Sequence, residues 1–322
     1  MLSAVIPVYN EEESLDALCG ELDQVAAANH LELEILFIDD GSKDGSWAVI
    51  ERLAAKDSRV RGIRLRRNFG KAAALTAGFD QARGDIFFTL DADLQDDPAE
   101  IPKFLAEMDA GRDCVSGWKK VRHDPWHKVL PSRVFNWMVG VLTGVKLHDH
   151  NCGFKAYRRE IFDEVRIYGE LHRFVPVLAH ARGWKVGEVV VQHRARKFGS
   201  SKYGVTRIVK GFLDLLTVWF LTGYGQRPQH FLGTLGLLSF TVGFVVLAYL
   251  SGLWIYAQQF PNANITPLHQ RPLALYALGV LLLGAQLIST GILAEMLAAG
   301  QSRQQPNYSV KQTCGAKRET AS

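Results

Sequence analysis

Short apolar runs alternate with amphipathic stretches over about the first two thirds of the chain. The runs at residues 2–8, 33–38 and 86–90 have the length and composition of buried strands. After the first two, apolar residues recur at helical spacing: Leu15, Leu18, Leu22 and Val25, then Trp47, Ile50, Leu53 and Ala54. This alternation predicts an α/β fold with a mainly parallel sheet and helices on both faces. Because ligands of such sheets bind beyond the carboxyl ends of the strands, we expect the loops after Val8, Ile38 and Leu90 to converge.

Weaker patterns extend the alternation. Ile63 and Leu65 predict a short strand, residues 72–81 a helix of small side chains, and residues 113–117 and 186–191 two further strands. Between the last two strands, basic residues are mixed with apolar residues at helical spacing: Lys119, Lys120, Arg122, Lys128 and Arg133 with Val129, Phe135, Trp137, Met138 and Val141. Such a helix suits a membrane interface, although a charged loop before an ordinary core helix is the alternative.

A more apolar pattern begins near residue 204. Residues 204–230 predict an amphipathic helix in the headgroup plane, with one apolar stripe of Val205, Ile208, Val209, Phe212, Leu216, Trp219 and Phe220. No Asp, Glu, Lys or Arg lies between Arg227 and Arg271, and residues 272–294 form a second uncharged stretch. Because about 20 apolar residues cross a bilayer, we predict transmembrane helices at about 231–257 and 272–296.

The distribution of basic residues predicts how these helices are oriented in the membrane. Only Arg271 is basic in the loop between them, whereas Lys and Arg are frequent on both flanks. The positive-inside rule therefore predicts a plasma (inner) membrane protein with both termini cytoplasmic. The expected organisation is a catalytic domain at 1–203, an interface helix at 204–230, a membrane hairpin at 231–298 and a disordered cytoplasmic tail at 299–322. The exposed pair of membrane helices makes a homo-oligomer a further expectation.

Composition adds three constraints. A chain of 322 residues can bury a sizeable core, and its net charge of +4 gives no reason to expect a nucleic-acid partner. The four cysteines (Cys19, Cys114, Cys152 and Cys314) are widely spaced and form no CxxC pair, which predicts reduced thiols. The first residues have no basic segment of the kind that opens a signal peptide.

The segment FFTLDADLQDDP, residues 87–98, carries the clearest candidate chemistry. Strand alternation would place Asp91, Asp93 and Gln95 on one side, just where a buried strand ends. Two carboxylates and an amide oxygen suit Mg²⁺ or Mn²⁺ that shares its shell with a substrate diphosphate. A strand end followed by a polar turn and a helix cap at Asp97 is the alternative.

This segment does not stand alone. The first strand ends in PVYNEEES and the second in DDGSKDGS, and HDHNCGFK follows at residues 148–155. In this order the segments closely resemble glycosyltransferase family 2, and the likeness covers roughly residues 2–201. The later segments are similar to those of its polyprenyl-phosphate glycosyltransferases. The resemblance implies a GT-A nucleotide-binding fold, a nucleotide-sugar donor, a polyprenyl phosphate acceptor and a site at the surface of a lipid bilayer.

The resemblance also assigns roles to residues. Pro7, Tyr9, Glu11, Asp40, Lys71 and Asp91 match donor nucleotide positions. Turn hydrogen bonds are the alternative role for Asp40, and solvation is the alternative for Lys71. Acceptor phosphate binding is carried over to Lys119, Lys128, Ser132 and Arg133. Asp93 and Asp149 match the catalytic positions, where Asp149 either positions the donor sugar or acts as a base. His148 and His150 lack a third ligand at regular spacing, which argues against zinc.

The basic segment QHRARKFGSSKYG, residues 192–204, completes the picture. A cationic loop with Arg194, Arg196 and Lys202 could close over a diphosphate, or the same charges could anchor the chain to the membrane. The expected reaction is inverting, metal-dependent transfer of a sugar from a UDP- or GDP-sugar to polyprenyl phosphate. The alternatives are a processive polysaccharide synthase, which would need a QxxRW segment where Gln192 is followed by HRARKF, and a non-catalytic membrane scaffold.

Overall fold

The computed structural model describes residues 1–120, 126–167, 169–194, 206–224, 227–260, 266–267 and 270–302, with the backbone alone at 126–130, 206–209 and 299–302. Contacts divide it into one unit at Met1–Thr222 and a second that begins at Gly223. Arg196, Lys202, Cys314 and the side chain of Lys128 lie outside the described part. Of the predicted tail, residues 303–322 lie outside it, whereas residues 299–302 are helical.

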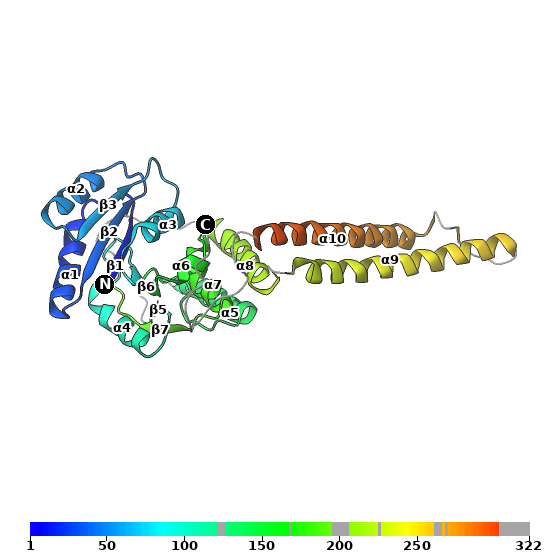
Figure 1. Ribbon diagram of the computed structural model, residues 1–322. Coiled ribbons are helices and arrows are strands. Elements are labelled where there is room, and N and C mark those ends of the chain that lie inside the picture. Colours follow the sequence, from blue (N-terminus) through cyan, green and yellow to red (C-terminus); the bar gives the residue numbers. More distant parts are fainter. Residues whose placement is uncertain are drawn as a thin grey trace, which may run out of the picture. The chain divides into compact units, whose positions relative to one another are not determined.

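Seven strands of the described chain form one sheet in the order β3-β2-β1-β4-β6-β5-β7 (Figure 1). Their bounds are β1 Leu2–Val8, β2 Leu33–Asp39, β3 Val60–Arg64, β4 Ile86–Thr89, β5 Cys114–Trp118, β6 Lys155–Arg158 and β7 Val186–Val190. The pairs β1–β2, β1–β4, β2–β3 and β5–β7 are parallel, and β6 runs antiparallel between β4 and β5. The prediction of a mainly parallel α/β sheet is confirmed.

Helices cover both faces of this sheet. The α-helices of the first unit are α1 Leu15–Ala28, α2 Ser46–Lys56, α3 Lys71–Gln81, α4 Ile101–Asp109, α5 Trp126–Thr143, α6 Ile161–Glu164, α7 Val175–Ala181 and α8 Thr206–Tyr224. Strand alternation sends Ala4 and Ile6 of β1 into a core with α1, α2 and α4. Val5 points into a second core, to which α3, α7 and α8 contribute. A sheet buried on both faces accounts for the unbroken apolar runs in the sequence.

The antiparallel strand β6 determines what lies at the carboxyl edge. Lys155, its first residue, pairs with Thr89 at the end of β4 and with Ser116 in β5. Because β6 runs antiparallel to both neighbours, its start lies at the edge where β4 and β5 have their carboxyl ends. The segment just before β6, residues 149–154, consequently lies beside the loop after β4.

Helices α5 and α8 present apolar side chains outward. Trp137 and Val141 of α5 are 67% and 63% exposed, and Phe212 and Leu216 of α8 are 48% and 47% exposed. Leu215 and Val218 of α8, outside the stripe predicted from sequence, are fully buried in the core. Helix α8 is thus apolar on two faces: the face with Leu215 and Val218 packs in the core of the first unit, and the face with Phe212 and Leu216 is exposed.

The second unit contains two long helices, α9 Pro228–Gln259 and α10 Pro272–Ser302. Helix α9 over its whole length and α10 over Pro272–Ala298 are long and apolar enough to span a membrane. Glycines allow the two backbones to approach, since a Cβ on Gly284 would lie 2.4 Å from the backbone N of Phe240. Glu295 accepts a hydrogen bond from the backbone N–H of Gln229, 3.1 Å away, near the start of α9. This close packing is typical of membrane helix pairs.

We expect Gly284→Ala to loosen this hairpin, because its Cβ meets backbone that cannot rotate away. Overpacking costs about 1–3 kcal/mol. Gly279→Ala in the same helix is the control, because its Cβ meets nothing within 4 Å. Thermal unfolding in detergent should show a lower midpoint for Gly284→Ala alone. Equal midpoints for the two variants would contradict this packing.

Candidate active site

The loop after β4 is a turn, not an extension of the strand. β4 ends at Thr89, and Leu94 has a φ of 59°. The predicted strand alternation therefore does not orient Asp91, Asp93 and Gln95, and that prediction is wrong. The turn keeps the three residues close in sequence, and the backbone N–H of Gln95 donates to Asp93 Oδ1 at 3.2 Å. Asp93 is buried, with 7% of its surface exposed.

Lys71 and Asp91 meet at this edge although they come from different loops. The Lys71 ammonium, at the start of α3, forms an ion pair with Asp91 Oδ1. Burial disfavours the charge of Asp91, but Lys71 and then Lys119 outweigh it, and the pKa of this carboxyl falls to about 2. Gly153 lies against the same carboxylate, where a Cβ would come within 2.6 Å of Asp91 Oδ2. Asp91 is therefore ionised at neutral pH.

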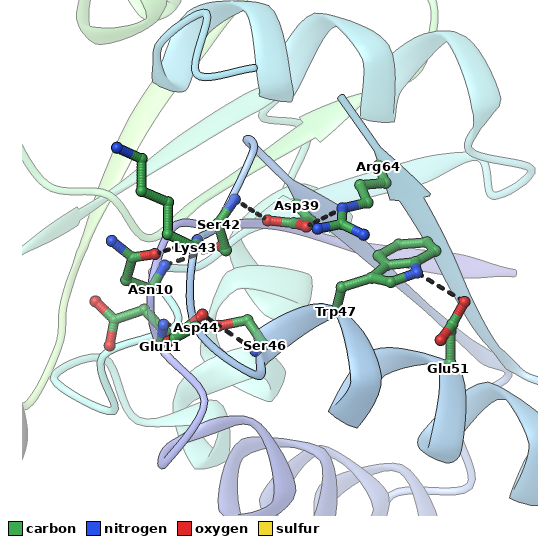
Figure 2. Close-up of polar contacts among 10 residues, drawn as sticks. All are labelled: Asn10, Glu11, Asp39, Ser42, Lys43, Asp44, Ser46, Trp47, Glu51 and Arg64. Atoms are coloured by element: carbon green, nitrogen blue, oxygen red, sulfur yellow. Dashed lines mark hydrogen bonds and ion pairs between the residues drawn. The ribbon is translucent and has the colours of Figure 1, made fainter. Parts of the chain in front are cut away.

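The loops after β1 and β2 interlock (Figure 2). The backbone N–H of Asn10 donates to Ser42 Oγ at 2.9 Å, and the backbone N–H of Lys43 returns a bond to Asn10 Oδ1 at 2.8 Å. The backbone N–H of Glu11 donates to Ser46 Oγ at 3.0 Å. Pro7 pairs with Ile38 in the sheet, directly before these loops. Pro7, Tyr9 and Glu11 are thus brought to the predicted edge.

Two adjacent aspartates at the end of β2 accept hydrogen bonds from nearby loop segments. Asp39 accepts from the backbone N–H of Ser42 at 2.8 Å and pairs with Arg64 at 3.2 Å (Figure 2). Asp40 accepts from the backbone N–H groups of Phe69 and Gly70, at 2.7 and 2.9 Å. By fixing residues just before Lys71, Asp40 contributes to the placement of the Lys71 ammonium. Whether it also contacts a nucleotide stays a prediction.

Asp149 is buried, with 2% of its surface exposed, in the segment before β6. Its Oδ1 accepts from the backbone N–H of Asn151 at 3.1 Å. Asn136 ties this segment to α5, because its side-chain N–H donates to the His148 carbonyl at 2.7 Å. Helix α5, which carries Ser132 and Arg133, is thereby fixed relative to Asp149.

Two predicted substrate cations make ion pairs inside the protein. Lys119 lies 2.9 Å from Asp96, whose side chain is 1% exposed. Burial disfavours the charge of Lys119, but Asp96 outweighs it and raises its pKa. Arg194 pairs with Glu21 of α1 at 2.8 Å and with Asp97 at 2.7 Å, and its backbone N–H donates to the Gln95 carbonyl. Both cations therefore brace the loop that carries Asp93 and Gln95.

A cavity of about 110 Å³ adjoins Asp91. Its wall includes Lys71, Asp91, Gly153, Lys155, His172 and Arg173. Sequence reasoning did not identify Lys155, His172 or Arg173 as site residues. Lys155 is the last residue of the GFK motif, which was one available signal. His172 and Arg173 lie in the short 3₁₀ turn η2 Leu171–Phe174, which carries no comparable pattern.

The donor set fits a hard divalent cation. Asp91 is ionised, Asp93 adds a second carboxylate and Gln95 adds a neutral oxygen, which is the chemistry that Mg²⁺ and Mn²⁺ prefer. Across the described residues, three or more His, Cys, Asp and Glu side chains do not gather in a metal-binding group. A cation here would thus depend on the Gln95 oxygen, water or substrate for its remaining ligands.

The comparisons with known proteins agree with this architecture. Residues 3–166 match the family model described as glycosyl transferase family 2. The dodecaprenyl-phosphate galacturonate synthase of Rhizobium johnstonii is 39% identical over 97% of this chain and 92% of its own length. The undecaprenyl-phosphate 4-deoxy-4-formamido-L-arabinose transferase of Proteus mirabilis is 34% identical over 98% of this chain and 95% of its own length.

The fold has solved counterparts. Glucosyl-3-phosphoglycerate synthase from Mycobacterium tuberculosis, in complex with Mn²⁺ and UDP-glucose, superposes with a TM-score of 0.53 at 16% identity. The match covers 69% of this chain and 78% of that one. The fold is thus the GT-A type. The chain belongs to glycosyl transferase family 2, and within it to the group of polyprenyl-phosphate glycosyltransferases.

We expect Lys119→Met to destabilise the first unit, because it leaves Asp96 buried without its counter-charge. Removing one partner of a buried ion pair costs about 3–5 kcal/mol. The double variant Lys119→Met with Asp96→Leu should recover much of that loss, because no charge stays buried. Chemical denaturation of the three proteins measures both effects. A single variant as stable as wild type would show that Lys119 has no bracing role.

Proposed function

We propose that the protein transfers a sugar from a nucleoside diphosphate donor, a UDP- or GDP-sugar, to polyprenyl phosphate at the cytoplasmic face of the membrane. The observation that carries this proposal is the meeting of Lys71 and Asp91 at the carboxyl edge, with Asp93 and Gln95 on the same turn. The names of the two relatives, which act on dodecaprenyl and undecaprenyl phosphate, support the acceptor class.

The donor has a place in this arrangement. Tyr9 and Glu11 follow β1, Asp40 follows β2 and Lys71 begins α3, so a nucleotide along this edge contacts three loops. The ammonium of Lys71 provides positive charge for the diphosphate. Asp91, Asp93 and Gln95 would hold Mg²⁺ or Mn²⁺, which supplies positive charge to the departing nucleoside diphosphate when bound.

The acceptor needs little proton chemistry. An oxygen of the lipid phosphate forms the new bond to the anomeric carbon, while the bond from that carbon to the donor phosphate oxygen breaks, with inversion. Because a phosphate monoester is already ionised at neutral pH, no base has to remove a proton from it. Ser132 and Arg133 of α5 are proposed to orient this phosphate together with Lys128. Asp149 is proposed to position the donor sugar.

The outward apolar side chains of α5 and α8 support a site at the bilayer surface. Trp137 and Val141 lie on the helix that also carries Arg133, so a lipid whose tail stays in the membrane presents its phosphate to that helix. In this proposal α9 and α10 anchor the chain in the plasma membrane with both ends cytoplasmic.

We expect Asp93→Asn to reduce transfer by about 10²–10³-fold, because the variant loses a carboxylate where charge develops. The assay uses full-length protein in detergent with Mn²⁺, polyprenyl phosphate and a panel of nucleotide-sugars, and measures released nucleoside diphosphate and glycolipid. Asp163→Asn, at an exposed position of α6, is the matched control.

Removal of divalent ions with EDTA should stop wild-type turnover, and Mn²⁺ or Mg²⁺ should restore it. Full activity of Asp93→Asn, or turnover that EDTA leaves unchanged, would contradict the metal-dependent mechanism. Failure of every donor with polyprenyl phosphate would contradict the proposed function itself.

A further inference from the structure

Side chains at heptad spacing lie on two sides of helix α10. One side packs against α9: a Cβ on Gly243 would lie 2.7 Å from the carbonyl oxygen of Ala277, and one on Gly236 would lie 2.8 Å from that of Gly284. Successive helical residues differ by about 100°, so Gln286 points about 200° away from Gly284 around the helix axis, on nearly the opposite side. The residues on this second side form the α10 seam: Leu282, Gln286, Ser289, Leu293 and Met296.

The α10 seam is open in the described part of the chain. Leu282, Leu293 and Met296 are 58%, 62% and 66% exposed, and Gln286 and Ser289 are exposed as well. The seam repeats at intervals of three and four residues, the spacing by which helices pack on one another in coiled coils. Its spacing therefore suits a further helix beside α10.

Gln286 lies in the middle of the span Pro272–Ala298, which is apolar enough to cross a membrane. At about 1.5 Å per residue it is about 21 Å from the first residue of that span and about 18 Å from the last, so it lies near the centre of a hydrocarbon layer about 30 Å thick.

The amide of Gln286 makes no hydrogen bond within the described residues. The hydroxyls of Thr241 and Ser289 differ, because each donates to a carbonyl four residues earlier in its own helix. A primary amide without a partner is costly in hydrocarbon, and lipid tails offer no hydrogen-bonding group. Another helix that carries such a group is therefore the expected neighbour of the seam.

The chemistry of the seam favours a second copy of this chain as that neighbour. A glutamine amide has both N–H donors and an acceptor oxygen, so two such amides satisfy each other. Copies inserted with the same orientation hold Gln286 at the same depth, and a two-fold axis along the membrane normal brings identical residues face to face. The seam carries no charged side chain, so a charged partner helix would find nothing to pair with.

We propose that two copies of the chain pair along the α10 seam, with their Gln286 amides exchanging hydrogen bonds near the centre of the membrane. The inference rests on the membrane anchoring in the proposed function and is independent of the donor and the acceptor. A single amide in such an interface fixes the register of the two helices, since a shift along the axis leaves both amides unpaired. Helix α10 is then packed on both sides, by α9 of its own chain and by α10 of the second copy.

The test measures the monomer–dimer equilibrium of the full-length protein by sedimentation in density-matched detergent. We expect Gln286→Leu to raise the dissociation constant at least about fivefold, the lower end for one lost hydrogen bond between membrane helices, whereas Gln286→Asn, which keeps an amide, should lose less. Gln258→Leu makes the same chemical change at an exposed position in the last turn of α9 and is the matched control. Circular dichroism checks that the variants keep their helices.

Cysteine cross-linking in lipid vesicles locates the interface. Leu282→Cys places a thiol on the seam, and Leu283→Cys places one about 100° further around the helix, at a residue with a similar exposure of 54%. Both variants also carry Cys314→Ser, because the other three cysteines are buried. Oxidation should join two copies through position 282 and much less through position 283, since a disulfide requires Cα atoms within about 7 Å of each other.

Any of three results would overturn the pairing. A wild-type protein that stays monomeric at all concentrations would leave the seam to the helix of a different protein. A dissociation constant that Gln286→Leu leaves unchanged, or equal cross-linking at the two positions, would show that the copies meet elsewhere. Extraction of the chain from vesicles by alkaline carbonate would instead contradict the membrane anchoring itself and, with it, the proposed function at the bilayer surface.

Discussion

The position of one antiparallel strand governs the site. In a sheet of parallel strands the carboxyl ends share an edge, and a strand that runs the other way brings its first residue to that edge. Because β6 lies between β4 and β5, Gly153 and Lys155 reach the loop that carries Asp91. The approach is so close that Gly153 leaves no space for a side chain against the Asp91 carboxylate. The cavity and its charge follow from this placement.

The elements that sequence predicted well are those with a strong local pattern. The apolar runs of β1 and β2 and the spacing of Leu15, Leu18 and Leu22 in α1 are local signals, and all of them lie in the core. β6 was not predicted, because four residues, KAYR, carry neither an apolar run nor a clear alternation. In α8 the pattern was ambiguous for a different reason. The helix is apolar on two faces, so sequence alone could not tell which face packs on the domain.

The residues of the candidate site also fall into two groups: those that a local sequence pattern identified and those that only the folded structure reveals. The carboxylates of the loop after β4, Lys71 and the segment around Asp149 were identified from sequence, and the structure places them at the carboxyl edge of the sheet. The ion pair from Arg194 to Glu21 joins residues far apart in the sequence, and no local pattern reports such a contact. The burial of Lys155 is equally a property of the folded sheet. A count of basic residues therefore overestimates the positive charge available to substrates, because Lys119 and Arg194 are engaged within the protein.

These internal pairs and the unmatched Lys155 have opposite energetic consequences. Lys119 with Asp96 is a buried pair whose two charges offset each other's loss of hydration. Lys155 has lost its hydration, and the carbonyl oxygens of His150 and Arg173 and the nearby charge of Asp149 compensate for part of that loss. A buried charge without an ion-pair partner opposes folding. Because the same strand start positions both Gly153 against Asp91 and Lys155 in the cavity, the sheet determines which charges line that cavity.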